Sequence, residues 1–170
     1  DVLRRRVADA PDAPVIYSGP DTYSYADLGA GVDAAIPVLK NAGIRAGDRV
    51  LLIAENSFAS ICFLYAIMAV DAWAVLANTR LTQREIAVMT DRARPRATIC
   101  VAGQTPENHK LAPADAIRCE HAAFGVVALG GIDDDAVPEP VPDVKDEQVA
   151  VVIFTSGTTG DPRGAWFTDR

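Results

Sequence analysis

The chain has 170 residues, of which 49% are hydrophobic, and its formal net charge is −7. This length suffices for one domain with a buried core, and the composition is that of a globular chain and not of a disordered one. The acidic charge argues against a surface that binds nucleic acid or an anionic membrane. The most apolar run, residues 60–70, is about half as long as a membrane-spanning helix needs to be. We therefore expect neither a nucleic-acid partner nor a membrane span.

The cysteines and histidines predict no metal site and no disulfide framework. The three cysteines contain no CxxC pair, and Cys62 and Cys100 lie in apolar runs, which predicts buried, unreactive thiols. His109 and His121 stand apart from other metal-ligating residues. The first residues, DVLRRRVADAPDAP, lack the apolar core of a signal peptide. We expect a cytoplasmic protein in a reducing compartment.

Residues 22–43 carry the pattern of a helix with defined ends. Their apolar residues recur at helical spacing. Ser24 and Asp27 are spaced as a capping box at the start, and Gly43 supplies the stop. Pro37 lies inside the pattern, so we expect a kink there.

The segments that follow alternate between strand and helix patterns. The run at residues 57–72 is apolar nearly all round, which predicts a helix in the interior of the fold. Thr82 and Glu85 cap a third helix, at 82–93. This alternation predicts an α/β fold built of βαβ units with a mostly parallel sheet. The predicted strands are residues 47–56, 73–78, 97–101, 124–129 and 149–155.

We expect residues 1–170 to form one domain with a single linker-like stretch. Residues 131–148, GIDDDAVPEPVPDVKDEQ, are rich in proline and carboxylates and contain one Lys. Such a stretch is typical of a solvated linker, and a specific binding tail is the alternative. It separates the βαβ part from the final strand and the loop after it.

Residues 155–164, TSGTTGDPRG, combine the features of an anion-binding loop. They follow a predicted strand, and ligands gather at the carboxyl ends of strands in parallel α/β sheets. Gly157 and Gly160 allow several backbone N–H groups to turn toward one point. Arg163 adds a permanent positive charge, so a polyphosphate is the expected ligand. The hydroxyl donors of the loop are Thr155, Ser156, Thr158 and Thr159.

Two other interpretations of this loop compete with a phosphate site. A Walker A loop needs Gly-Lys-Ser/Thr leading into a helix, but here Gly164 follows Arg163 and the next residues, AWFT, predict a strand. The other interpretation is a Gly- and Thr-rich hairpin that binds nothing, because such loops are common.

The sequence FTSGTTGDPRG resembles the phosphate-binding signature of the adenylate-forming superfamily. Its members include acyl- and aryl-CoA synthetases, the adenylation domains of peptide synthetases and firefly luciferase. The stretches TYSYADL, AGIRAGDRVLLIAENS and ANTRLTQREI are similar to the large N-terminal domain of these enzymes in order and spacing. The resemblance covers the N-terminal portion of such an AMP-binding domain. Because the chain also begins at Asp1 and not at Met, we expect a piece of a longer protein.

The resemblance implies a two-step reaction. A carboxylate attacks the α-phosphate of ATP to give an acyl-adenylate and pyrophosphate, and a thiol, usually that of coenzyme A, then displaces AMP. Arg163 stands where the family usually has Lys, and Arg80, in NTRLT, is a weaker candidate for the phosphates of coenzyme A, with an ordinary surface arginine as the alternative. The residues implied to hold the β- and γ-phosphates of ATP with Mg²⁺ are Thr155, Ser156, Gly157, Thr158, Thr159 and Gly160.

The resemblance also places much of the enzyme beyond residue 170, including the acid-binding pocket, a Mg²⁺-ligating Glu and a catalytic Lys. We therefore expect no catalytic residue and no metal ligand within these residues, and no activity from them alone. Asp71, Leu76 and Asp169 depart from the family pattern and suggest a divergent member. Fatty, aromatic and small acids stay open as substrates, as do all oligomeric states. The alternatives are an adenylation domain that passes its acyl group to a carrier protein, and a non-catalytic module that binds ATP or a partner.

Overall fold

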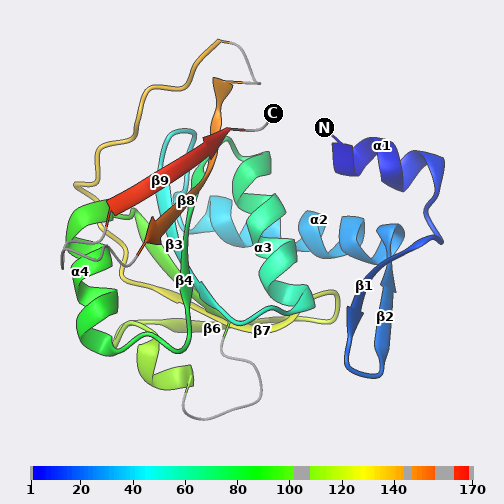
Figure 1. Cartoon of the computed structure of the whole chain (residues 1–170), viewed down its shortest axis with the longest axis horizontal. Coiled ribbons are helices and arrows are strands. Elements are labelled where there is room, and N and C mark those ends of the chain that lie inside the picture. Colours follow the sequence, from blue (N-terminus) through cyan, green and yellow to red (C-terminus); the bar gives the residue numbers. More distant parts are fainter. Residues whose placement is uncertain (1, 102–107, 144–146, 156–162, 169–170) are drawn as a thin grey trace.

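The computed structural model describes residues 2–101, 108–143, 147–155 and 163–168, and its main feature is a seven-stranded sheet (Figure 1). The strand order is β6-β7-β5-β3-β4-β8-β9. The four central strands are parallel to one another, and the pairs at both ends of the sheet are antiparallel. The parallel strands are β3 (Arg49–Ala54), β4 (Trp73–Asn78), β5 (Ala97–Val101) and β8 (Val149–Thr155), and the others are β6 (Ile117–His121), β7 (Gly125–Gly130) and β9 (Arg163–Thr168).

Helices cover both faces of the central strands, as expected for a parallel sheet (Figure 1). Successive side chains of β3 point to opposite faces. Val50 and Leu52 join one core cluster with α2 and α3, whereas Leu51 and Ile53 join a second cluster with α4. The predicted α/β class with a mostly parallel sheet is therefore confirmed. The helices are α2 (Tyr25–Asn41), α3 (Phe58–Ala69) and α4 (Gln83–Ala93).

The ends of α2 follow from its sequence. Ser24 accepts a hydrogen bond from the Asp27 N–H, and the Asp27 carboxylate accepts one from the Ser24 N–H, which confirms the capping box. Gly43 follows the helix with a φ of 74°, a conformation that glycine adopts without strain. The helix continues through Pro37 to Asn41.

The helix α3 is less enclosed than its composition predicts. Cys62 and Phe63 are fully buried against α2 and the sheet, but Ile61 and Leu64 on its other flank are only half-buried. The two helices approach closely because α2 has Gly31 at the crossing, where an added Cβ would lie 2.4 Å from the Cys62 Sγ. Burial raises the pKa of the Cys62 thiol to about 12, in keeping with the predicted inert thiol.

Several short elements were not predicted from the sequence. Among them, α1 packs on α2, and Arg4 donates to the Asp33 carboxylate at 3.0 Å. This hydrogen bond holds the pKa of Asp33 below its ordinary value. No helix in the described ranges is long and apolar enough to cross a membrane. The unpredicted elements are α1 (Val2–Asp9), the hairpin β1 (Pro14–Ser18) and β2 (Asp21–Ser24), the 3₁₀ turn Asn108–Leu111 and β6.

Candidate functional site

The carboxyl ends of the parallel strands form one edge of the sheet, and the predicted phosphate loop leaves from this edge. Leu52 of β3 pairs with Leu76 of β4, and Leu76 pairs in turn with Ile153 of β8. The three strands therefore end side by side, at Ala54, Asn78 and Thr155. This is the edge at which ligands bind in open α/β sheets.

The loop joins two antiparallel strands. The backbone of Thr155, at the end of β8, pairs with that of Arg163, at the start of β9. Because a strand and not a helix follows the loop, the Walker A alternative is excluded, as the sequence predicted. For Thr155 and Arg163 the structure describes the backbone alone. The candidate residues Ser156, Gly157, Thr158, Thr159 and Gly160 lie outside the described residues, so their role stays a prediction.

Two helices begin at the same edge. The Ser57 hydroxyl caps α3 by accepting from the Ser60 N–H at 3.2 Å, and Thr82 caps α4 in the same way through the Glu85 N–H. The Thr82 N–H donates in turn to the Glu85 carboxylate at 2.7 Å, which lowers the pKa of Glu85. Both helices thus direct the positive ends of their dipoles toward the edge from which the loop leaves, which favours an anion there.

A groove with a volume of about 370 Å³ opens at this edge, beside the start of the loop. Its apolar wall contains Ile61 and Leu64 of α3 and Ile153 of β8, and its polar side contains Glu55 and Asn78. Among the described residues, Glu55 is the one carboxylate that lines the groove, and its oxygen accepts a hydrogen bond from the Thr79 hydroxyl at 3.0 Å. The described lining of the groove thus contributes a negative charge, and the feature that favours an anion at this edge is the amino termini of α3 and α4.

The turn after β4 contains the second candidate, Arg80. The Asn78 side-chain oxygen accepts from the Arg80 N–H at 2.8 Å, so Asn78 stabilises this turn as the sequence predicted. Arg80 is exposed at the carboxyl edge. The structure thus brings Arg80 and the ends of the predicted phosphate loop to the same edge, although they are far apart in the sequence.

Sequence reasoning missed part of this site. The groove wall from α3 was not foreseen, because apolar residues of a helix that looks fully buried give no sign of which flank lines a groove. The helix predicted at 57–72 begins at the observed cap of α3, but the cap itself was not identified, although Ser57 and Ser60 have the spacing of a cap and directly precede an apolar run.

The chain has relatives among known enzymes. A family model described as AMP-binding enzyme matches residues 3–170. The chain is 30% identical to the "Long-chain-fatty-acid--CoA ligase FadD13" of Mycobacterium tuberculosis, over 98% of this chain and 34% of the relative. It is 27% identical to a "2-succinylbenzoate--CoA ligase" of Bacillus cereus, over 98% of this chain and 32% of the relative.

A solved structure described as "Mycobacterium tuberculosis fatty acyl CoA synthetase" superimposes on the chain with a TM-score of 0.70 at 25% identity, covering 98% of this chain and 33% of that one. The chain spans about a third of the length of the curated relatives it matches.

Proposed function

Because the chain belongs to the family of AMP-binding enzymes, we propose that it is part of a ligase that activates a carboxylic acid with ATP and transfers the acyl group to coenzyme A. The observation that carries this proposal is the position of TSGTTGDPRG. Its first residue, Thr155, ends β8 and pairs with Arg163 of the antiparallel β9, at the edge of the sheet where α3 and α4 begin. Backbone donors, hydroxyl groups and helix dipoles together suit a polyphosphate.

In the proposed enzyme, residues 155–160 bind the β- and γ-phosphates of ATP, with Mg²⁺ neutralising part of their charge. Arg163 adds a fixed positive charge that stabilises the pyrophosphate as it leaves. This role is electrostatic and involves no proton transfer. Arg80, exposed in the turn after β4, is proposed to contact the phosphates of coenzyme A.

The acyl acceptor is proposed from the relatives. Both curated relatives described above are named as coenzyme A ligases, one for long-chain fatty acids and one for 2-succinylbenzoate. Their acids differ in shape but share a carboxylate. We therefore assign a carboxylic acid as the substrate class and propose coenzyme A as the acceptor.

The test uses a polypeptide of the relatives' length that carries this sequence, because the reaction needs residues beyond the phosphate loop. Purified protein is assayed for acid-dependent ATP–pyrophosphate exchange with fatty and aryl acids, without coenzyme A. Exchange with one acid class is expected, and adding coenzyme A should then release AMP and form a thioester. Absence of exchange with every acid, from protein shown to be folded, would refute the adenylation step. The 170-residue chain alone is the control and is expected to show no exchange.

A further inference from the structure

The edge of the sheet opposite the candidate site is crossed by an acidic segment, residues 131–143, which we name the acidic strap. It follows β7, whose last residue, Gly130, pairs with Thr98 near the start of β5. In the sheet, β5, β3 and β4 separate β7 from β8. The chain that leaves β7 must therefore pass the starts of three parallel strands before it can form β8.

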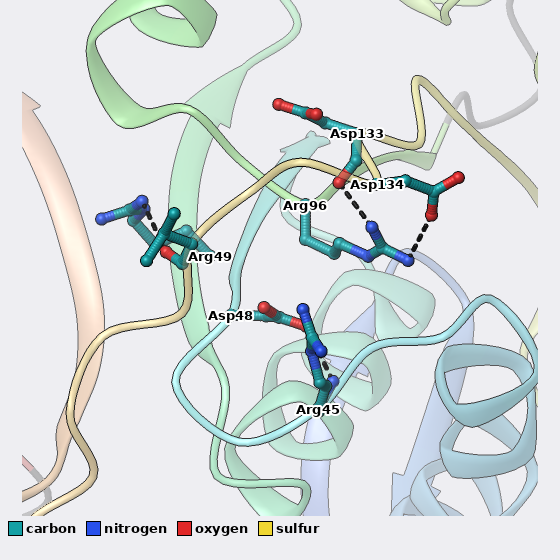
Figure 2. Close-up of polar contacts among 7 residues, drawn as sticks. Arg45, Asp48, Arg49, Arg96, Asp133 and Asp134 are labelled. Atoms are coloured by element: carbon teal, nitrogen blue, oxygen red, sulfur yellow. Dashed lines mark hydrogen bonds and ion pairs between the residues drawn. The ribbon is translucent and has the colours of Figure 1, made fainter.

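The first attachment of the strap lies at the start of β5. Arg96 immediately precedes this strand, and its guanidinium donates to the Asp133 carbonyl at 2.5 Å and pairs with the Asp134 carboxylate at 2.7 Å (Figure 2). The backbone N–H of Asp133 donates back to the Arg96 carbonyl at 2.9 Å. The Arg96 side chain is 10% exposed, so these partners satisfy a charge that is nearly removed from water.

The second attachment lies at the start of β3. Arg49 pairs with the Glu139 carboxylate and donates to the Val137 carbonyl at 3.2 Å. The Glu139 N–H donates to the Gly47 carbonyl at 2.9 Å. Gly47 has a φ of 80°, and an added Cβ would lie 2.1 Å from the Glu139 carbonyl oxygen. The backbone of the strap therefore rests directly on Gly47.

The third attachment lies beside β4, where the chain enters β8. Gln148 directly precedes β8, and its side-chain amide donates to the Asp71 carbonyl at 2.9 Å. The same carbonyl accepts the Gly47 N–H at 2.8 Å. The attachments thus follow one another along the chain in the order β5, β3 and β4, which is the order of these strands in the sheet.

We propose that Arg49 and Arg96 are positioning residues, which fasten the acidic strap across the starts of β3 and β5 and so set where β8 begins beside β4. A strand whose register slips by one residue turns every side chain to the other face. The register of β8 against β4 also fixes how far β8 extends at the opposite edge. It therefore fixes the position of Thr155, from which the predicted phosphate loop leaves. The effect of the β8 register on the phosphate loop rests on the proposed function, whereas the fastening of the strap by Arg49 and Arg96 does not.

The strap is more than the solvated linker that its sequence predicted. Most of its side chains are exposed, as the sequence predicted for a linker, but Ala136 is buried and the arginines hold both halves of the strap. Two of its carboxylates, those of Asp134 and Glu139, therefore have specific partners at the starts of the strands.

Hydrogen exchange on the 170-residue chain tests the fastening without ATP. Arg49→Ala and Arg96→Ala are compared with Arg118→Ala, which removes an exposed ion pair with Glu120. We expect amides of the strap and of β8 to exchange about tenfold faster in the first two variants, with those of β3 and β5 unchanged. The control should match the wild type. Unchanged exchange in β8, or an equal rise in every strand, would overturn the proposal.

Glu139→Gln keeps the experiment decisive if an arginine variant does not fold. The Glu139 side chain is 37% exposed, so this change weakens the Arg49 pair without opening the core. It should raise exchange in the strap and in β8 in the same pattern but to a smaller extent. Wild-type exchange in both segments would count against the proposal.

Kinetics in the longer enzyme test whether the strap positions the phosphate loop through β8. Arg96→Ala should raise the KM for ATP about five- to tenfold while the KM for the acid stays constant, because the loop is displaced and the acid pocket is not. A purely structural role would lower the active fraction and leave both KM values unchanged, which would overturn this step. If the proposed function is wrong, the wild-type enzyme will show no ATP–pyrophosphate exchange. Amide hydrogen exchange would still test whether Arg49 and Arg96 fasten the strap.

Discussion

The amino and carboxyl edges of the same parallel strands are built from different kinds of contacts. At the amino edge, Arg49 and Arg96 are largely buried and reach across to the acidic strap. At the carboxyl edge, Glu55 and Asn78 are exposed around an open groove, and the hydrogen bonds of the described residues there stay within turns and caps or join two short segments, as the Gln83 amide does with the Lys110 carbonyl. One edge is closed by long-range pairs, and the other leaves its polar groups accessible to a ligand.

The two edges also differ in how well their polar groups are satisfied. All buried side-chain polar atoms that lack a hydrogen-bond partner in the described part of the chain lie at the amino edge or directly beside it. They are the Asp48 Oδ1, the Arg49 Nε, the Trp73 Nε1, the Arg96 Nε and the Gln148 Oε1. A partly satisfied buried network is costly to disturb further, because each lost partner adds a desolvation penalty. Changes at the amino edge should therefore act first on stability and reach activity only through the position of β8, whereas changes to side chains that contact the ligand at the carboxyl edge should act on activity directly.

The largest expected effect lies at the carboxyl edge. Arg163→Ala in the longer enzyme should slow ATP–pyrophosphate exchange by about 10²-fold or more, because removing one preorganised group at a developing charge typically has this effect. Arg163→Lys should recover part of the rate, since it keeps the charge but not the geometry. Arg84→Ala, an exposed arginine of α4, is the matched control and should change the rate little. Normal exchange by folded Arg163→Ala protein would remove this residue from the site.

The next effect concerns stability at the amino edge. Gly47 and Gly125 have nearly the same φ, 80° and 81°, but an added Cβ meets the strap at Gly47 and open space at Gly125. Gly125→Ala should cost about 1 kcal/mol of unfolding free energy from backbone strain alone, and Gly47→Ala about 3 kcal/mol. Urea unfolding of the 170-residue chain measures both. Equal losses of unfolding free energy in the two variants would mean that the strap moves away from the added methyl group at little cost. The contact between Gly47 and the strap would then not stabilise the amino edge.

The strands were predictable where the sequence is locally decisive. Apolar runs bounded by turn residues predicted β4, β5 and β8 with the observed bounds, because strands of a parallel sheet read as continuous apolar segments, even in β8, where Ile153 is 40% exposed. The capping boxes of α2 and α4 were likewise visible as pairs of residues three positions apart. Local pattern and tertiary structure agree at these places.

The strap attachments could not be predicted in this way. Arg49 and Glu139 are 90 positions apart, and nothing in either local sequence identifies the other as its partner. The acidic composition of residues 131–148 predicted solvation, and the specific pairing of some of these carboxylates depends on the strand order of the whole sheet. The phosphate loop was found from its motif, whereas the groove beside it depends on how α3 packs.

A smaller effect is expected from a cap at the carboxyl edge. Thr82→Ala removes the hydroxyl that accepts the Glu85 N–H and should cost about 1 kcal/mol of unfolding free energy. Because this contact is confined to the first turn of α4, hydrogen exchange in the acidic strap should stay at the wild-type rate. Faster exchange in the strap would show that the two edges are coupled through α4.

The same variant has a defined pH dependence. The pKa of Glu85 is lowered in the folded protein by its hydrogen bonds with Thr82. A lowered carboxylate pKa contributes stability above the unfolded value, and this contribution is lost as the pH falls through the folded value. The difference in unfolding free energy between the wild type and Thr82→Ala should therefore shrink but not vanish below about pH 4, because protonation removes the bond from the hydroxyl to the carboxylate and leaves the bond from the Glu85 N–H to the hydroxyl. A constant difference from pH 7 to pH 3 would mean that the Thr82 hydroxyl does not stabilise the Glu85 carboxylate.

The smallest effect is expected from Arg118→Ala, which removes an arginine–carboxylate pair of the same chemistry as those at the amino edge. Both side chains are exposed, at 65% for Arg118 and 64% for Glu120. Water screens such a pair, so its loss should change the unfolding free energy by at most about 0.5 kcal/mol. Arg96→Ala, measured beside it by urea unfolding, should cost several times more, because the Arg96 side chain is 10% exposed and its loss leaves the Asp133 carbonyl without this donor, whereas the Asp134 carboxylate is 86% exposed and adds little. Equal losses of unfolding free energy in the two variants would mean that burial does not make the Arg96 contacts stronger than the exposed Arg118 pair. The backbone contact at Gly47 would then be the remaining feature that distinguishes the amino edge.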